Sequence, residues 1–321
     1  MNLQPWLAEN WRQLATALAH QRLHHGLLFA APAGYGKRAL ATALAAAALC
    51  QQRLPDGHAC GHCRACLLFA AGTHPDFVRI TFELRDDGKP RTEITIDQMR
   101  SLSQRLAMSS QFGGLQIALV DPADRLNASA ANALLKTLEE PAAATILLLV
   151  ADDPSRLPAT IRSRCQRIDV RAPARAEALA WLEGQRIGSA DANEALDASL
   201  GNPGQALAWS ADDTLALRGS CADDLAALAR GRRSALEVAE AWAADRPDTR
   251  LWFAAVLARD EAQRLARGES GRFGLTAPAE IPKLAAWFSR ANQTRGLLAT
   301  TVRTDLVLLD VLRAWSTPAN Q

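Results

Sequence analysis

Short runs of apolar residues alternate with helical patterns over the first half of the chain. The apolar runs are Gly26–Ala30, Phe77–Phe82, Gln116–Val120, Thr145–Val150 and Gln166–Val170. Each has the length of a buried strand, whereas the segment Ala128–Glu140 places Leu134, Leu135 and Leu138 at helical spacing. Alternating strands and helices are typical of a parallel sheet covered by helices. We therefore predict a domain of the α/β class over residues 1–168.

The pattern changes near Pro173, and the residues downstream have helical periodicity. A first group of predicted helices comprises Arg175–Glu183, Ala192–Leu200 and Gln205–Trp209. A second group comprises Leu215–Arg230, Ser234–Ala244, Thr249–Arg267, Ile281–Ser289 and Thr294–Trp315. The two groups predict a small helical domain over residues 169–209 and an all-α domain over residues 210–321.

The composition is that of a globular protein. With 321 residues, 49% of them hydrophobic, the chain can form two or three domains with substantial cores. It has no run of eighteen apolar residues, and its N-terminus does not resemble a signal peptide. We therefore expect a cytoplasmic protein with no membrane segment. The net charge of +2 does not support a protein that binds nucleic acid alone, so DNA contacts are expected to be local or shared with partners.

The first predicted strand leads through a short loop into an Ala- and Leu-rich helix, which is the context of a phosphate-binding loop. Gly34, Gly36 and Lys37 fit such a loop. Arg38, however, stands where the motif has the Ser or Thr that binds Mg²⁺, and a cation repels this metal. The first glycine of the motif is also replaced, by Ala31. The sequence therefore predicts a degenerate nucleotide loop.

A second element is altered in the same way. The strand Gln116–Val120 is followed by Asp121, an acid placed as in a Walker B motif. ATPases of this layout usually carry a glutamate at the next position, where it orients and deprotonates the attacking water. Here the next residue is Pro122, which cannot accept a proton. We therefore expect no ATP hydrolysis, although a chance match of a short Gly-x-Gly-Lys motif stays open at this point.

Four of the six cysteines form a cluster in the sequence, Cys50, Cys60, Cys63 and Cys66. In a reducing compartment this spacing indicates a metal site rather than disulfides. Four thiolates leave no open position for a substrate, so we predict a structural zinc site. Free thiols or a redox-active Cys-x2-Cys pair are the alternative, and the nearby His58 and His62 could replace a cysteine as ligand.

Two further segments carry a specific resemblance. They are Asn132–Pro141, which reads Asn-Ala-Leu-Leu-Lys-Thr-Leu-Glu-Glu-Pro, and Leu157–Cys165, which reads Leu-Pro-Ala-Thr-Ile-Arg-Ser-Arg-Cys. With the loop, the Asp121 strand and the four cysteines in this order, the chain resembles bacterial sliding-clamp loader subunits of the AAA+ class. The resemblance is strong over residues 1–210 and concerns only length and class beyond them. It implies an AAA+ RecA-like domain (1–168) with an inserted zinc module (50–66), a helical lid domain (169–209) and a collar for oligomerisation (210–321).

Within this family, four positions depart from the ATP-hydrolysing tau/gamma type of subunit. Arg38 replaces a hydroxyl residue, Pro122 replaces a glutamate, the segment Ala151–Asp153 lacks an expected threonine, and Gly204 stands near an expected arginine. The resemblance thus implies a subunit that does not hydrolyse ATP, with tau/gamma and delta subunits, the sliding clamp and primer-template DNA as partners. Lys37 is retained, so ATP binding stays open, and a hydrolysing subunit of the tau/gamma type is the alternative.

The resemblance also assigns Ser163 and Arg164 to an arginine finger that acts in trans on ATP held by a neighbouring subunit. Such a role is physically reasonable, because a guanidinium stays charged and its planar fork can bridge phosphate oxygens during phosphoryl transfer. The other interpretation of Arg164 is a surface arginine paired with an acid.

Two other classes of function compete with this interpretation. A working ATPase with unusual metal coordination would rely on Lys37, Asp121 and Asp124, although Pro122 argues against it. An independent zinc-dependent DNA-binding module would use Arg53, Arg64 and His58 around the cysteines, although the net charge and the small size of the insert argue against it.

Overall fold

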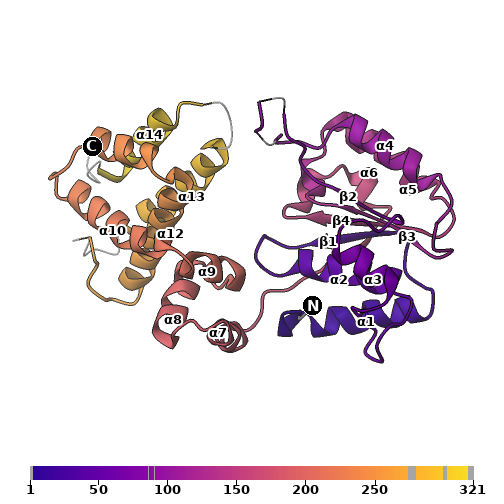
Figure 1. Cartoon of the computed structure of the whole chain (residues 1–321). Helices are drawn as coiled ribbons and strands as arrows, with labels where there is room; N and C mark the ends of the chain where they lie inside the picture. The colour runs from indigo at the N-terminus through magenta and orange to yellow at the C-terminus, as the bar shows by residue number, and fades with distance from the viewer. Residues whose placement is uncertain (1–2, 86, 90, 274–279, 299–301, 317–321) are drawn as a thin grey trace. The chain divides into compact units, whose positions relative to one another are not determined.

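The computed structural model of the chain describes residues 3–85, 87–89, 91–273, 280–298 and 302–316 (Figure 1). It divides into two compact units, of which the first comprises Met1–Gly184 with Asn202–Gln205 and the second Gln185–Gly201 with Ala206–Gln321. The three domains expected over residues 1–168, 169–209 and 210–321 stay a prediction. Among the described residues, no helix combines the length and the apolar character that a membrane span needs.

A five-stranded parallel sheet forms the centre of the first unit. Its strands are β1 (Gly26–Ala30), β2 (Phe77–Ile80), β3 (Gln116–Val120), β4 (Thr145–Ala151) and β5 (Gln166–Asp169). They lie in the order β2-β3-β4-β1-β5, and every neighbouring pair is parallel. β1, β3 and β4 are buried along their whole length, which explains their uninterrupted apolar sequences. The predicted α/β class is confirmed.

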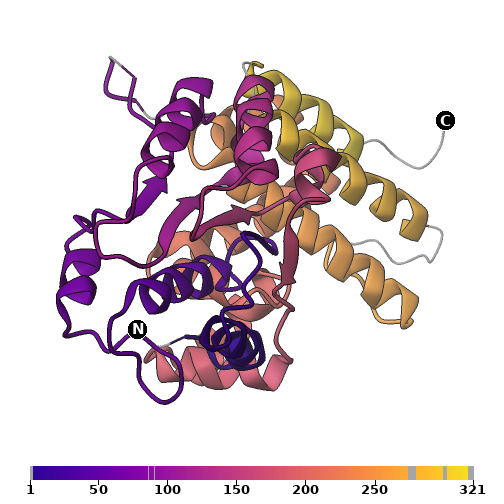
Figure 2. The same cartoon turned by 90° about the vertical axis from the view of Figure 1, so that its right-hand side faces the viewer.

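Helices cover both faces of this sheet. One face packs against α1 (Ala8–Ala19) and α2 (Lys37–Leu49). The other packs against α4 (Ile96–Leu106), α5 (Ala128–Glu139) and α6 (Ala159–Arg162). Figures 1 and 2 show these two layers with the strands between them. Alternate residues of β1 point to opposite faces, because Leu27 and Phe29 belong to the core beside α1 and α2, and Leu28 to the core beside α4 and α5.

Shorter elements complete the first unit. They are η1 (Pro5–Leu7), α3 (Arg64–Ala70), η2 (Ala123–Arg125), η3 (Pro154–Arg156) and α7 (Arg175–Gly184). The cysteine segment with α3 lies between α2 and β2, within the first crossover of the sheet, as the sequence predicts. α5 is capped at its N-terminus by Asn127, whose side chain accepts the N–H of Ala130 at 2.9 Å.

The described part of the second unit is helical. Its elements are α8 (Ser189–Ala198), η4 (Asp213–Leu215), α10 (Ala216–Ala229), α11 (Ala235–Ala244), α12 (Pro247–Ala266), α13 (Ile281–Leu298) and α14 (Thr304–Ser316), and α9 (Pro203–Ser210) has residues in both units. Its core contains the buried tryptophans Trp209, Trp242, Trp287 and Trp315 among leucines and alanines. Trp287 donates to the Val311 carbonyl at 2.9 Å and Trp315 to the Leu225 carbonyl at 3.0 Å, as buried indoles require.

The expectation of one helix over Thr294–Trp315 is wrong. α13 begins at Ile281 and continues to Leu298, and a separate helix, α14, begins at Thr304. Residues 299–301 lie outside the described residues, but Val302 and Arg303 are not helical. The β-branched Val302 has a low helix propensity, and the Arg303 guanidinium binds Asp305 in the first turn of α14 at 2.6 Å.

Candidate functional site

The loop between β1 and α2 has the backbone that its glycines predict. Gly34 and Gly36 both have left-handed φ angles, of 94° and 90°, which glycine adopts without strain. A Cβ at Gly36 would lie 2.5 Å from the Oε1 atom of Gln4, so the loop is also closely packed there. Both glycines are therefore required by the backbone of this loop, and its chemistry depends on the side chains that follow.

Lys37, the residue that would contact phosphate, binds other residues of the chain instead. Its side chain is 1% exposed, and its ammonium donates to the Pro32 carbonyl at 3.1 Å and forms an ion pair with Asp152. Burial lowers the pKa of Lys37, and the bond to Asp152 opposes this shift. The carboxylate of Asp152 therefore stands in for the anion that such a lysine binds in a working site.

Arg38 binds both acids next to the loop. Its two terminal nitrogens donate to the two carboxylate oxygens of Asp152 at 2.8 and 2.9 Å, and its Nε donates to Asp121 at 2.9 Å. The bidentate bond to Asp152 raises the pKa of Arg38. Burial alone would raise the pKa of Asp152, but its bonds to Arg38 and Lys37 outweigh this effect and lower it. Arg79 adds a third cation at 3.5 Å from Asp121, so both acids have cationic partners from the chain.

Two residues that follow α8 hydrogen-bond the other side of the loop. The side-chain amide of Asn202 donates to the Ala33 carbonyl at 2.7 Å, and the N–H of Gly204 donates to the Gly34 carbonyl at 3.1 Å. A Cβ at residue 204 would lie 2.3 Å from that carbonyl oxygen. A residue with a side chain at position 204 has no room without a shift of the backbone.

The acids near β3 are bound by other groups of the chain. Asp121 is buried and bound by Arg38, and the following Pro122 offers no side-chain acceptor. Asp124, the second acid considered for a metal, is also buried and accepts the N–H of Asp153 at 3.0 Å. Asp121 and Asp124 therefore both have partners within the chain.

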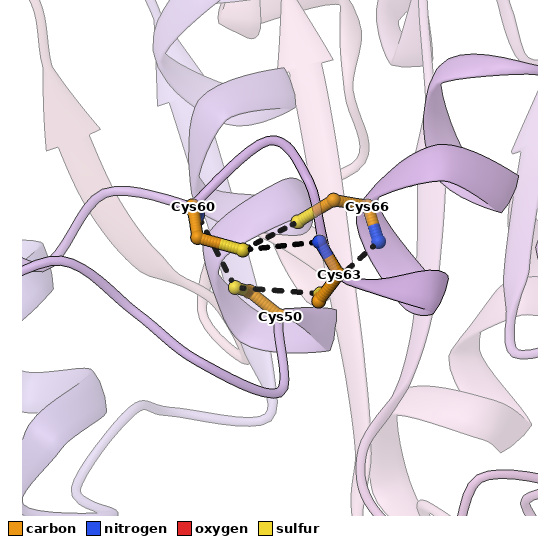
Figure 3. A group of neighbouring side chains, drawn as sticks. All are labelled: Cys50, Cys60, Cys63 and Cys66. Carbon is orange, nitrogen blue, oxygen red and sulfur yellow. Dashed lines mark hydrogen bonds between the residues drawn. The ribbon is translucent and has the colours of Figure 1, made fainter.

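The four predicted cysteines come together, as Figure 3 shows. The Sγ atoms of Cys50, Cys60, Cys63 and Cys66 all lie within 4.8 Å of one another. The Cys50–Cys63 and Cys60–Cys66 distances are 4.0 and 3.9 Å, close to the edge of about 3.8 Å that a tetrahedron with Zn–S bonds of about 2.3 Å requires. The structure therefore brings together a ligand set that fits a tetrahedral metal ion.

Backbone N–H groups surround these sulfurs. The N–H of Cys63 points to the Sγ of Cys60 at 3.3 Å, and the N–H of Cys66 points to the Sγ of Cys63 at 3.4 Å. Burial alone raises the pKa of Cys63, but the N–H of Cys66 and other hydrogen bonds to its sulfur bring it down to about 6. Such bonds stabilise the thiolate form that binds metal.

The cysteine segment is fixed to α1. The rings of His58 and Trp11 stack with centroids 4.0 Å apart, and the Trp11 indole donates to the Asp56 carbonyl at 3.1 Å. His58 therefore contacts an aromatic ring, and the other substitute ligand, His62, hydrogen-bonds the carbonyl of Cys60 through its Nδ1 at 3.0 Å. Neither histidine belongs to the group of close metal-ligand atoms.

Arg164 lies in the short connection from α6 to β5. One terminal nitrogen is 2.7 Å from the Oε1 of Glu139, and the other donates to the Thr160 carbonyl at 3.0 Å. Its side chain is 38% exposed. Ser163 is exposed and donates to the same carbonyl at 3.1 Å. The guanidinium is therefore at the surface but held by two acceptors.

Sequence reasoning missed three residues of these sites. They are Asp152 and Asn202 at the loop, and Glu139 beside Arg164. A usable signal existed for Asp152. β1 pairs with β4 and Ala30 is opposite Ala151, so an acid directly after β4 lies beside the loop directly after β1.

Comparison with known proteins gives consistent matches. Residues 6–174 match the model of the family DNA polymerase III, delta subunit. The chain is similar to the DNA polymerase III subunit delta' of Pseudomonas aeruginosa, with 45% identity over 56% of this chain and 52% of that protein. It is also similar to the same subunit of Escherichia coli, with 41% identity over 67% of this chain and 65% of that protein. The chain thus aligns with about half to two thirds of the length of these relatives.

Among solved structures, the chain is similar to a DNA polymerase III gamma subunit-related protein from Thermotoga maritima. The TM-score is 0.43 and the sequence identity is 16%, over 95% of this chain and 98% of that chain.

Proposed function

The chain belongs to the delta prime subunits of bacterial DNA polymerase III, and from this premise we propose that it is a clamp-loader subunit that does not hydrolyse ATP. In this role it assembles in the cytoplasm with tau/gamma and delta subunits and helps to load the sliding clamp on primed DNA. It supplies an arginine finger in trans to the ATP site of a neighbouring tau/gamma subunit.

One observation carries the non-hydrolysing part of this proposal, namely that the chain's own charged side chains fill its nucleotide loop. Mg²⁺-ATP would have to displace Asp152 from Lys37 and from Arg38. The metal would also have to lie where the Arg38 guanidinium binds Asp121, and like charges repel. The proline after Asp121 then leaves no base for water. Phosphate binding and metal binding are thus opposed by charged side chains of the chain, and activation of water lacks a general base.

The finger role depends on the placement of Arg164. Its guanidinium is partly exposed and fixed at two points, and Ser163 beside it is exposed as well. An arginine supplied by a neighbouring chain increases the rate of phosphoryl transfer by a factor of about 10³–10⁵ in well-studied GTPases. These observations support the proposal that Arg164 acts on the nucleotide of another subunit, while the loop of this chain takes no part in the chemistry.

The cysteine cluster completes the proposal as a structural zinc site. Cys50, Cys60, Cys63 and Cys66 have the spacing and the donor set of a closed tetrathiolate, and a bound Zn²⁺ would hold residues 50–66 together. The site offers no open position, so the metal takes no part in a reaction. Its effect is on the conformation of the segment that contacts α1.

The proposal is tested in a complex reconstituted with tau/gamma and delta subunits. Arg164→Ala is expected to leave assembly intact and to lower DNA-stimulated ATP hydrolysis and clamp loading by about tenfold or more. Arg162→Ala is the matched control, because it removes an exposed arginine two residues away on α6 and is expected to leave turnover unchanged. Wild-type turnover in the Arg164→Ala complex would contradict the finger role.

The isolated chain separates this proposal from the hydrolysing alternative of the tau/gamma type. We expect ATP turnover at the level of the background without protein. Hydrolysis by the isolated chain that Lys37→Ala abolishes would support the alternative instead.

A further inference from the structure

The partners of Arg164 come from two elements of the fold. The Thr160 carbonyl belongs to α6, four residues before Arg164, whereas Glu139 is the last residue of α5. The two acceptors bind different terminal nitrogens of the guanidinium, at 3.0 and 2.7 Å. Two bonds to different nitrogens of one planar group fix both its position and its orientation.

The backbone below this side chain is also fixed. The N–H of Arg164 donates to the Ile161 carbonyl at 3.1 Å. The Arg164 carbonyl lies against β1, where a Cβ on Gly26 would be 3.4 Å from it. The next residue, Cys165, packs on the core between the sheet and α5. The backbone of Arg164 is therefore fixed by packing and hydrogen bonds. The direction of its long side chain depends on side-chain contacts.

We propose that Glu139 is a positioning residue for Arg164, an inference that rests on the finger role proposed above. A long arginine side chain loses rotamer entropy when it is fixed in one conformation. Glu139 and the Thr160 carbonyl fix the Arg164 side chain before it contacts ATP. This loss of entropy therefore does not occur at the neighbouring ATP site. The two contacts use two of the five N–H donors of the guanidinium, which leaves the others for phosphate oxygens.

The location of Glu139 supports this role. An acid at the C-terminal end of a helix is unfavourable, because the carbonyl end of the helix carries partial negative charge. Glu139 ends α5 and is followed by a second acid, Glu140. The ion pair with Arg164 offsets this electrostatic cost at Glu139. Glu140 is exposed and close in sequence, and it provides a matched control with the same change of charge.

The test uses the same reconstituted complex, with kcat and KM for ATP measured separately under DNA stimulation. Glu139→Gln is expected to lower kcat by about tenfold, as misplacement of a catalytic group does, and to change KM for ATP by less than about twofold. Glu140→Gln is expected to change neither. In the Arg164→Ala background, Glu139→Gln is expected to have no further effect, because a positioning residue has nothing left to position.

The outcomes separate the inference from the function on which it rests. Wild-type turnover with Arg164→Ala overturns the finger role and the inference with it. If Arg164→Ala slows turnover but Glu139→Gln gives wild-type or faster turnover, the finger stands and the positioning role is overturned. An equal loss from Glu139→Gln with and without Arg164 also overturns it, because the effect would then be structural. The melting temperature of Glu139→Gln is expected within about 3 °C of wild type.

Discussion

Asp152→Ala directly tests the ion pairs that Asp152 forms with Lys37 and Arg38 in the nucleotide loop. The change leaves the buried Lys37 ammonium without its acid and deprives Arg38 of its bidentate partner, although Arg38 keeps Asp121. Removing one member of a buried ion pair costs about 3–5 kcal/mol. Because Asp152 is 37% exposed, water can partly replace it, and we expect about 2 kcal/mol. For a unit of this size, that loss lowers the melting temperature by about 4–8 °C.

The assay is thermal unfolding of the isolated chain, with and without inorganic pyrophosphate. In Asp152→Ala, the anion can pair with Lys37 and Arg38, and a ligand at a hundred times its dissociation constant contributes about 2.7 kcal/mol. We therefore expect pyrophosphate to restore most of the melting temperature of the variant and to leave the wild type unchanged, since Asp152 already occupies the site. Sodium chloride of equal ionic strength provides the control for screening.

Asp169→Ala is the matched control variant. It removes an acid paired with Arg167 at 2.7 Å, and both side chains are more than half exposed, so a loss of less than about 1 kcal/mol is expected. The reasoning is refuted if Asp152→Ala melts within about 1 °C of wild type. It is equally refuted if pyrophosphate stabilises the wild type as much as the variant.

Two further predictions concern the cysteine cluster and a buried acid. Cys63→Ser is expected to lower the zinc content, measured by elemental analysis, from about one ion per chain to near zero. Tryptophan fluorescence should change as well, because the Trp11 ring stacks on His58 of the cysteine segment. The control Cys165→Ser should keep the metal, and a wild-type protein without zinc would contradict the site. Asp76 is buried and accepts the N–H groups of Gln111 and Phe112 at 2.8 and 2.9 Å. Burial alone would raise its pKa, but these bonds lower it below the usual 3.8. The ionised Asp76 carboxylate thus stabilises the folded state above pH 3.8, and this stabilisation is lost as the pH falls through the lowered pKa. In urea unfolding from pH 7 to 3, the free energy of unfolding should therefore fall less steeply at acid pH for Asp76→Asn than for the wild type. An equal fall in both proteins would contradict the assignment.

Local patterns were sufficient for the framework of the first unit. Uninterrupted apolar runs located the strands because β1, β3 and β4 are buried on both faces. The loop glycines and the spacing of the four cysteines likewise carry their geometry in the sequence, because turns and tetrahedral sites depend on neighbours in the chain.

The partners within the sites could not be found in this way. Asp152 lies 115 residues from Lys37, and Asn202 lies 169 residues from Ala33. Such pairs exist only after strand order and loop closure bring the segments together. The break between α13 and α14 was missed for another reason, since apolar residues at helical spacing continue on both sides of Val302 and periodicity alone does not register a short interruption.

The ion pairs of the nucleotide loop also bear on how such a site can change over evolutionary time. Replacing Arg38 with threonine would restore a metal ligand but leave Asp152 on Lys37, where phosphate would have to bind. Replacing Asp152 would free Lys37 but leave the Arg38 guanidinium against Asp121. An arginine at position 204 would collide with Gly34 in either background. Each of these single substitutions leaves another of the described contacts in place, so opening the loop to Mg²⁺ and phosphate would require several replacements together.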